Sequence, residues 1–132
     1  MYRLWLFIAG IMGCASLIAA TYGAHGLSGA APTAVKIYDT ASLHHGTHSI
    51  AMALTAVLLA ATDGRRSTFG GVLMNIAAFA FFAGMILFSG SLYYQIVRGV
   101  QDMIPLAPIG GTLLMLGWLA LALSAFGIRR AG

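Results

Sequence analysis

Four long apolar runs dominate this chain and restrict what it can fold into. A helix that crosses a bilayer needs about 20 predominantly apolar residues, and runs of that length cover residues 4–24, 42–62, 69–97 and 104–128. Only 8% of the 132 residues are charged, whereas a soluble domain carries about a quarter. The alternating pattern of a membrane β-barrel is missing from the sequence. We therefore predict an all-α integral membrane protein, with residues 1–132 forming one four-helix transmembrane bundle.

The first apolar run also has to be compared with a secretory signal peptide, because Arg3 precedes it and small residues follow. The apolar core of a signal peptide covers about 7–15 residues, and the run at 4–24 is longer. We therefore expect a retained helix. The chain has one cysteine, Cys14, so the sequence gives no disulfide from which to infer a redox compartment.

The basic residues between the runs predict an orientation. The side that carries both termini has five arginines and one aspartate: Arg3, Arg65, Arg66, Arg129, Arg130 and Asp63. The other side has Lys36 and Arg98 with Asp39 and Asp102. Under the positive-inside rule both termini lie on the cytoplasmic side, in a bacterial inner (plasma) membrane or, as the alternative, in the mitochondrial inner membrane. The cations are too few and too scattered for nucleic-acid binding.

Polar side chains gather where the predicted helices meet the outer face. His25 ends the first helix and His44, His45 and His48 open the second, while Ser89, Ser91, Tyr93 and Tyr94 end the third. Ionisable groups in membrane segments are costly and usually belong to a site or a buried polar contact. We predict that these eight residues form a polar cap or a ligand site.

The chemistry of this cap has two interpretations. His44 and His48 share a helix face, so together with His25 they could offer three nitrogens to zinc or copper; haem binding and proton relay are further possibilities. Alternatively, the imidazoles hydrogen-bond to tyrosine, serine or backbone groups and hold the connection in place. We favour the second interpretation. No spacing specifies a Ser-His-Asp triad, so we expect no catalytic residue and no cofactor.

Small residues at helical spacing predict faces where helices pack closely. They are Ala15, Ala19 and Gly23 in the first run, Ala80 and Gly84 in the third, and Gly110 with Gly111 in the fourth. Asn75 is a lone polar group for which we expect a partner on another helix, and Trp5 and Trp118 are expected to pack or face lipid. Residues 25–41 are expected to form the longest connection, an irregular turn followed by an interfacial helix.

Several motifs together carry a family resemblance: Gly23-Ala24-His25-Gly26, the segment from Tyr38 to His48, Ser91-Leu92-Tyr93-Tyr94, and Leu106 to Gly111 continued by Gly117-Trp118. With these motifs the chain resembles the YgdD/YwdK-like family of small four-helix membrane proteins, long labelled a domain of unknown function. His44-His45 and Leu106-Ala107-Pro108 are most similar to its eukaryotic, mitochondrially associated branch. The resemblance implies the fold and a membrane location, and it brings no established activity.

Two classes of function follow. The one we favour is a non-catalytic accessory or assembly subunit of a larger membrane complex, with a respiratory complex as the expected host. Its partners would be the lipid bilayer and other membrane subunits or further copies of itself, and not nucleic acid. The alternative is a metal- or small-ligand-binding membrane protein that uses the outer histidines.

Overall fold

A computed structural model describes residues 1–63, 65–100, 102–103 and 105–128. Its elements are α1 (Tyr2–Gly26), α2 (Pro32–Ala61), α3 (Thr68–Met85), a π-helical turn η1 (Ile86–Gly90), α4 (Ser91–Arg98), α5 (Leu106–Ser124) and a 3-10 turn η2 (Ala125–Gly127). Because η1 connects α3 to α4, the described residues contain four long helices, and the all-α four-helix prediction is confirmed. Ile104, which begins the fourth predicted run, and Arg129 and Arg130 lie outside the described residues.

Three helical segments are long and apolar enough to cross a membrane: Tyr2–Gly26, Thr68–Arg98 and Leu106–Gly127. Helix α2 is less apolar because it carries three histidines, yet its 30 residues extend about 45 Å at the usual rise per residue. It packs against both α1 and α3. Its polar side chains can therefore face other helices instead of lipid.

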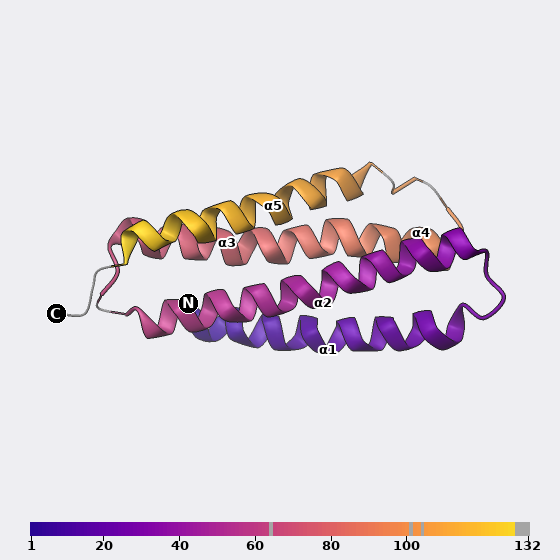
Figure 1. The fold of residues 1–132 in the computed structure, drawn as a ribbon, viewed down its shortest axis with the longest axis horizontal. Helices are drawn as coiled ribbons and strands as arrows, with labels where there is room; N and C mark the ends of the chain where they lie inside the picture. The colour runs from indigo at the N-terminus through magenta and orange to yellow at the C-terminus, as the bar shows by residue number, and fades with distance from the viewer. Residues whose placement is uncertain (64, 101, 104, 129–132) are drawn as a thin grey trace.

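The long helices run antiparallel to their neighbours along one axis (Figure 1). One end holds the N-terminus, the connection from α2 to α3 and the last described residues; we call it the terminal end. The other holds the connections from α1 to α2 and from α4 to α5; we call it the distal end. The N-terminus and the last described residues thus lie at the same end of the bundle.

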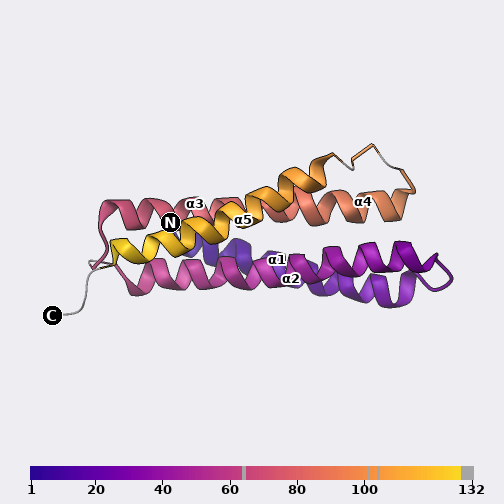
Figure 2. The same ribbon diagram turned by 45° about the horizontal axis from the view of Figure 1, so that its top comes forward.

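The bundle consists of two helix pairs. Helix α1 packs mainly on α2, α5 packs mainly on α3 and η1, and the pairs meet chiefly through α2 and α3. Figure 2 shows α1 and α2 side by side along one flank and α3 continued by α4 along the other, with α5 running obliquely across α3. Because α1 and α5 each pack mainly against one neighbouring helix, much of the surface of both helices is not covered by the rest of the chain.

Local sequence explains where the helices begin and end. Helix α2 begins at Pro32, in its first turn, where the missing N–H of proline costs nothing. The Ser67 hydroxyl caps α3 by accepting from the Gly70 N–H at 3.1 Å. Gly99 ends α4 in the left-handed conformation, with φ 66°. Helix α2 thus begins well before the predicted residue 42, and the α1–α2 connection is a short turn instead of the long one that we expected.

Glycines bring α3 and α5 close together. A Cβ on Gly84 would lie 2.5 Å from the Leu114 side chain, and one on Gly117 would lie 2.8 Å from the Phe81 ring. A Cβ on Gly110 would collide with the backbone N of Phe88 and lie 2.7 Å from the Leu87 carbonyl carbon. These contacts leave no room for a side chain, so Gly84, Gly110 and Gly117 serve packing inside the chain.

One hydrogen bond links α1 to α3 across the bundle. The Trp5 indole N–H donates to Asn75 Oδ1 at 2.8 Å, and the Asn75 amide donates to the Gly71 carbonyl at 2.8 Å. Trp5 is buried in this position. The structure therefore gives Asn75 the interhelical partner that the sequence predicts, and Trp5 is a donor as well as a packing ring.

Candidate functional site

The three histidines of α2 face two different sides of that helix. The His45 ring lies 5.9 Å from the Tyr93 ring of α4, whereas His48 lies 6.2 Å from Trp118 of α5. The His44 ring stacks on His48 at 5.6 Å, and His25 is exposed near the end of α1. The predicted cap is therefore divided by α2 into two separate groups of polar side chains.

His48 links α2 to α5. Its Nε2 accepts a hydrogen bond from the Trp118 indole N–H at 3.2 Å, and its Nδ1 lies 2.7 Å from the His44 carbonyl oxygen. Phe81 of α3 also packs on the ring, with the centroids 5.8 Å apart. His48 is therefore a buried polar contact among three helices, and Trp118 is one of its partners.

These two hydrogen bonds define the tautomer of His48. An indole N–H can only donate, so Nε2 must present its lone pair, and in a neutral imidazole the proton is then on Nδ1. That proton is donated to the His44 carbonyl. Both nitrogens are thereby occupied, and metal ligation through His48 would break one of the two bonds.

The proposed metal set is not assembled. Among the described residues, no group of three or more His, Cys, Asp or Glu side chains is placed to hold a metal ion. His25 sits on α1, whose packing partner is α2, while His44 and His48 face the opposite direction, toward α5. The arrangement of His25, His44 and His48 therefore fits hydrogen bonding and packing better than coordination.

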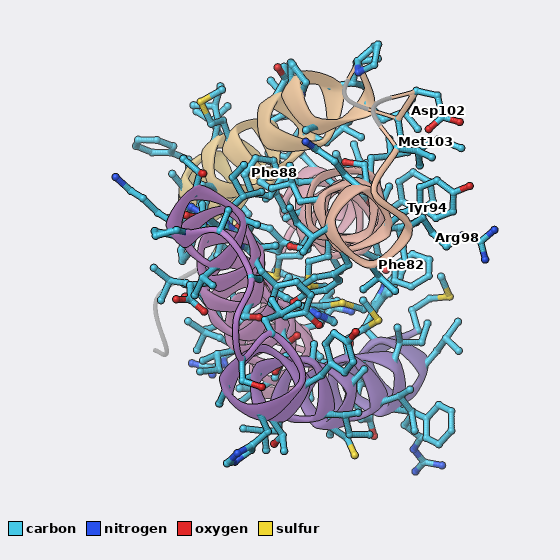
Figure 3. The ribbon with its side chains drawn as sticks, turned by 90° about the vertical axis from the view of Figure 1, so that its right-hand side faces the viewer. Phe82, Phe88, Tyr94, Arg98, Asp102 and Met103 are labelled. Carbon is cyan, nitrogen blue, oxygen red and sulfur yellow. The ribbon has the colours of Figure 1, made fainter. Side chains whose placement is uncertain are left out.

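His44 and His48 border a cleft of ≈ 370 Å³ between α2 and α5, which we call the tryptophan cleft. Its lining is His44, His48, Phe88, Ala107, Pro108, Gly111, Thr112, Leu114, Met115 and Trp118. The Phe88 ring meets His44 edge-on at 5.2 Å, and Figure 3 shows it on the side of α4 that faces α2 and α5. The cleft is almost wholly apolar in its lining, and both ring nitrogens of His48 are already hydrogen-bonded.

His45 belongs to a second network on the other side of α2. Its Nδ1 lies 3.3 Å from the Tyr93 hydroxyl, which donates to the Ser42 hydroxyl at 3.4 Å. Tyr93 also packs on Tyr38 at 4.8 Å, and Tyr38 on Tyr22 at 5.9 Å. The His45 ring is buried, and its Nε2 has no hydrogen-bond partner among the described residues.

This network borders a cleft of ≈ 480 Å³, which we call the tyrosine cleft. Its lining is Ala15, Ile18, Ala19, Tyr22, Tyr38, His45, Tyr93 and Val97. It lies where α1 and α4 fail to pack against each other near the distal end. Ala15 and Ala19, two of the predicted packing residues, line this cleft, whereas Gly23 packs under Tyr38.

The remaining residues of the predicted cap have different surroundings. The Ser89 hydroxyl donates to the Ala41 carbonyl at 2.9 Å and ties η1 to α2, whereas the Ser91 hydroxyl donates to the Phe88 carbonyl of its own helix. Tyr94 points away from the bundle beside Arg98 (Figure 3). Tyr93 therefore joins the His45 group by contact, Ser89 connects η1 to α2 without touching a histidine in any hydrogen bond given above, and Tyr94 belongs to neither group.

Sequence reasoning missed Trp118, Tyr38 and Ser42. Tyr38 is buried and Ser42 is half-buried, whereas the Trp118 side chain is 45% exposed although its N–H is hydrogen-bonded to His48. An indole or phenol in a membrane protein usually finds a hydrogen-bond partner, so several histidines in one membrane helix and a single tryptophan in another are a signal for such a pair. The sequence alone does not say which histidine it is.

Fold and site together define a small multi-pass helical membrane protein with buried histidine contacts. Residues 19–111 match the family described as "Protein of unknown function (DUF423)", and the chain belongs to that family. The resemblance to YwdK-like proteins is thereby confirmed. The closer likeness to a eukaryotic branch stays a prediction.

Bacterial relatives match almost the whole chain. The UPF0382 membrane protein YwdK of Bacillus subtilis is 26% identical over 124 residues, which cover 93% of this chain and 96% of YwdK. A UPF0382 membrane protein of Haemophilus influenzae is 32% identical over 123 residues, covering 92% and 93%. No solved structure shows significant similarity. The relatives and the spanning helices identify the chain as a multi-pass bacterial membrane protein.

Proposed function

We propose that this protein is a non-catalytic accessory or assembly subunit that docks onto other membrane helices through the face shared by α1 and α2. The supporting observation is an apolar groove of ≈ 420 Å³ between these helices. Its lining contains Gly10 and Gly13 from α1 and Gly46 from α2. We call it the glycine groove.

The glycines of this groove are not required by packing inside the chain. A Cβ on Gly10 would meet no atom within 4 Å, and one on Gly13 would meet only the Ser49 Cβ, at 4.0 Å. Glycine inside a helix costs about 1 kcal/mol relative to alanine. In membrane helices that cost is offset where a second backbone approaches closely. A helix of another subunit, or of a second copy, would make use of the space at Gly10.

The polar groups support a role without catalysis. Asp39, Asp63 and Asp102 are all exposed, and among the described residues none pairs with a histidine. The histidine hydrogen bonds lead to Trp118, Tyr93 and a backbone carbonyl. These contacts stabilise the bundle and provide no acid–base pair.

Filling the glycine groove tests the docking surface. In Gly10→Ile we expect normal folding, because the position is open, and loss of most association with the partner or second copy. Cys14, exposed on the same face of α1 one turn away, is a native reporter: oxidation in intact membranes should cross-link it to a partner cysteine, if one is near, or to a second Cys14. Blue-native electrophoresis then shows the assembled state, including co-migration with a respiratory complex.

Ala122→Ile is the matched control, because Ala122 is exposed on α5, away from the face shared by α1 and α2, and it lines neither the glycine groove nor either of the two clefts. It should leave assembly unchanged. Equal assembly of wild type and Gly10→Ile would overturn the docking proposal, as would a wild-type protein that migrates alone after mild extraction from native membranes.

We further infer that the terminal end faces the cytoplasm, since Arg3, Arg65 and Arg66 belong to it. A fluorescent protein fused after residue 132 should therefore be bright in bacteria, while an alkaline phosphatase fusion at the same place stays inactive. Active phosphatase there would reverse the assignment. A fusion in the 27–31 turn gives the opposite pattern and serves as the control.

Of the alternative functions, small-ligand binding has one observation in its favour. That observation is the unpartnered nitrogen of His45 beside the tyrosine cleft.

A further inference from the structure

The Nε2 atom of His45 is a buried hydrogen-bonding group without a partner. The His45 side chain is 7% exposed, and no described residue forms a hydrogen bond with Nε2. Leaving such a group unpaired costs about 1–3 kcal/mol. Since buried polar groups in native proteins are almost always paired, the atom indicates a partner that does not belong to this chain.

The hydrogen bonds around Tyr93 define what that partner must offer. In the arrangement in which the Tyr93 hydroxyl donates its one proton to the Ser42 hydroxyl, the Tyr93 oxygen accepts from His45, and the imidazole proton is then on Nδ1. Nε2 then carries a lone pair, and the missing group is a donor, such as a hydroxyl.

The surroundings of His45 indicate what the rest of the ligand, apart from its donor group, must look like. The rings of Tyr22, Tyr38 and Tyr93 follow one another in contact along the tyrosine cleft. Aromatic pairs of this kind contribute about 0.5–1.5 kcal/mol beyond the burial of their area. The small side chains of Ala15 and Ala19 leave space on the α1 side of the cleft, which has a volume of ≈ 480 Å³ and is open on one side.

Water alone fits this site poorly. A buried water needs two to four polar partners, and the lining of the tyrosine cleft is nearly all apolar. The site needs a donor for Nε2 and an apolar body for the rest of the cleft. A flat ring with one hydroxyl supplies both, because the ring packs against the tyrosines while its hydroxyl donates to Nε2.

We propose that the tyrosine cleft binds a membrane-soluble amphiphile whose head is a hydroxylated aromatic ring. The head hydroxyl donates to His45 Nε2, the ring lies against Tyr38 and Tyr93, and the tail follows Ala19 and Ala15 of α1 toward the membrane interior. The site is separate from the glycine groove, so it does not depend on the docking proposal.

Three redox-inert probes separate the parts of this proposal: 4-decylphenol, 4-decylanisole and 4-decylcyclohexanol. The anisole keeps the ring and lacks the donor, whereas the cyclohexanol keeps the donor and lacks the aromatic ring. Binding is measured to the full chain in nanodiscs, with partition into protein-free nanodiscs subtracted. We expect the phenol to bind about fivefold more tightly than the anisole, the equivalent of one net hydrogen bond. The cyclohexanol should be about threefold weaker than the phenol, because it loses the aromatic contacts.

Three variants and one spectrum locate the site. His45→Phe should abolish the preference for phenol over anisole, while His44→Phe, its neighbour in the other cleft, should keep it. Ala19→Leu fills the cleft without removing a polar group and should weaken all three probes. Independently of any variant, 4-decylphenol should shift the ¹⁵N resonance of His45 Nε2 upfield, as expected for a lone pair that accepts a hydrogen bond.

Equal binding of phenol and anisole to the wild type, or an unmoved Nε2 resonance, would overturn the proposal. Equal binding of phenol and cyclohexanol would overturn its aromatic part and leave an alcohol site. A loss in His44→Phe as large as that in His45→Phe would place the site elsewhere. Thermal unfolding of each variant, followed by circular dichroism, identifies a variant that has simply lost its fold, and the wild-type probe series and spectrum then decide.

Discussion

Replacing Gly110 by alanine is expected to lower the free energy of unfolding by about 2 kcal/mol or more, since overpacking of a close interface costs about 1–3 kcal/mol and sometimes more. The added Cβ would meet the backbone of Leu87 and Phe88, which cannot rotate away as a side chain does. Helix α5 would have to separate from η1. Equilibrium unfolding in mixed micelles, followed by circular dichroism, measures the loss.

Gly111→Ala is the matched control. A Cβ there would lie 3.5 Å from the Phe88 ring, an ordinary contact, and alanine is the better helix former by about 1 kcal/mol. We therefore expect Gly111→Ala to be neutral or stabilising. If the two variants lose the same stability, the close approach of α5 to η1 described here is incorrect.

The contrast between these neighbours shows where sequence reasoning stops. The length and apolarity of the four runs predicted the helices, because a membrane accepts few other structures. Gly110 and Gly111 were equivalent in that reasoning. Which of them meets η1 depends on the rotation of α5 about its axis, and a helix that is apolar all round carries no periodic signal for that rotation.

The same limit applied to the histidines. Their spacing predicted that His44 and His48 share a face and that His45 lies on a neighbouring one, and the structure has this arrangement. The sequence did not contain the order of the helices around α2. With α5 on one side and α1 and α4 on the other, the predicted single cap becomes two groups, and His25 is left exposed at the end of α1.

His48→Ala is expected to lower the free energy of unfolding by about 3 kcal/mol, within the range for removing a large buried side chain. The substitution opens a cavity between α2, α3 and α5, where the imidazole contacts Phe81 and Trp118. It also removes the acceptor of the Trp118 N–H. Equilibrium unfolding in mixed micelles measures the loss. His44→Ala should lose about 1 kcal/mol, because His44 is half-buried and contributes mainly ring contacts.

The hydrogen bond itself is isolated by a double-mutant cycle with Trp118→Phe and His48→Phe. Interhelical hydrogen bonds in membranes couple by about 0.6 kcal/mol on average, with a maximum near 1.7. A coupling in that range would support the tautomer in which Nε2 of His48 accepts from Trp118. Additive losses, with no coupling, would contradict this tautomer, and the Nε2 lone pair would then be free to bind a metal.

A zinc titration of the wild type is the second measurement. If the indole occupies Nε2, zinc should leave the unfolding midpoint unchanged, because zinc binding would first have to break a contact that holds α5 to α2.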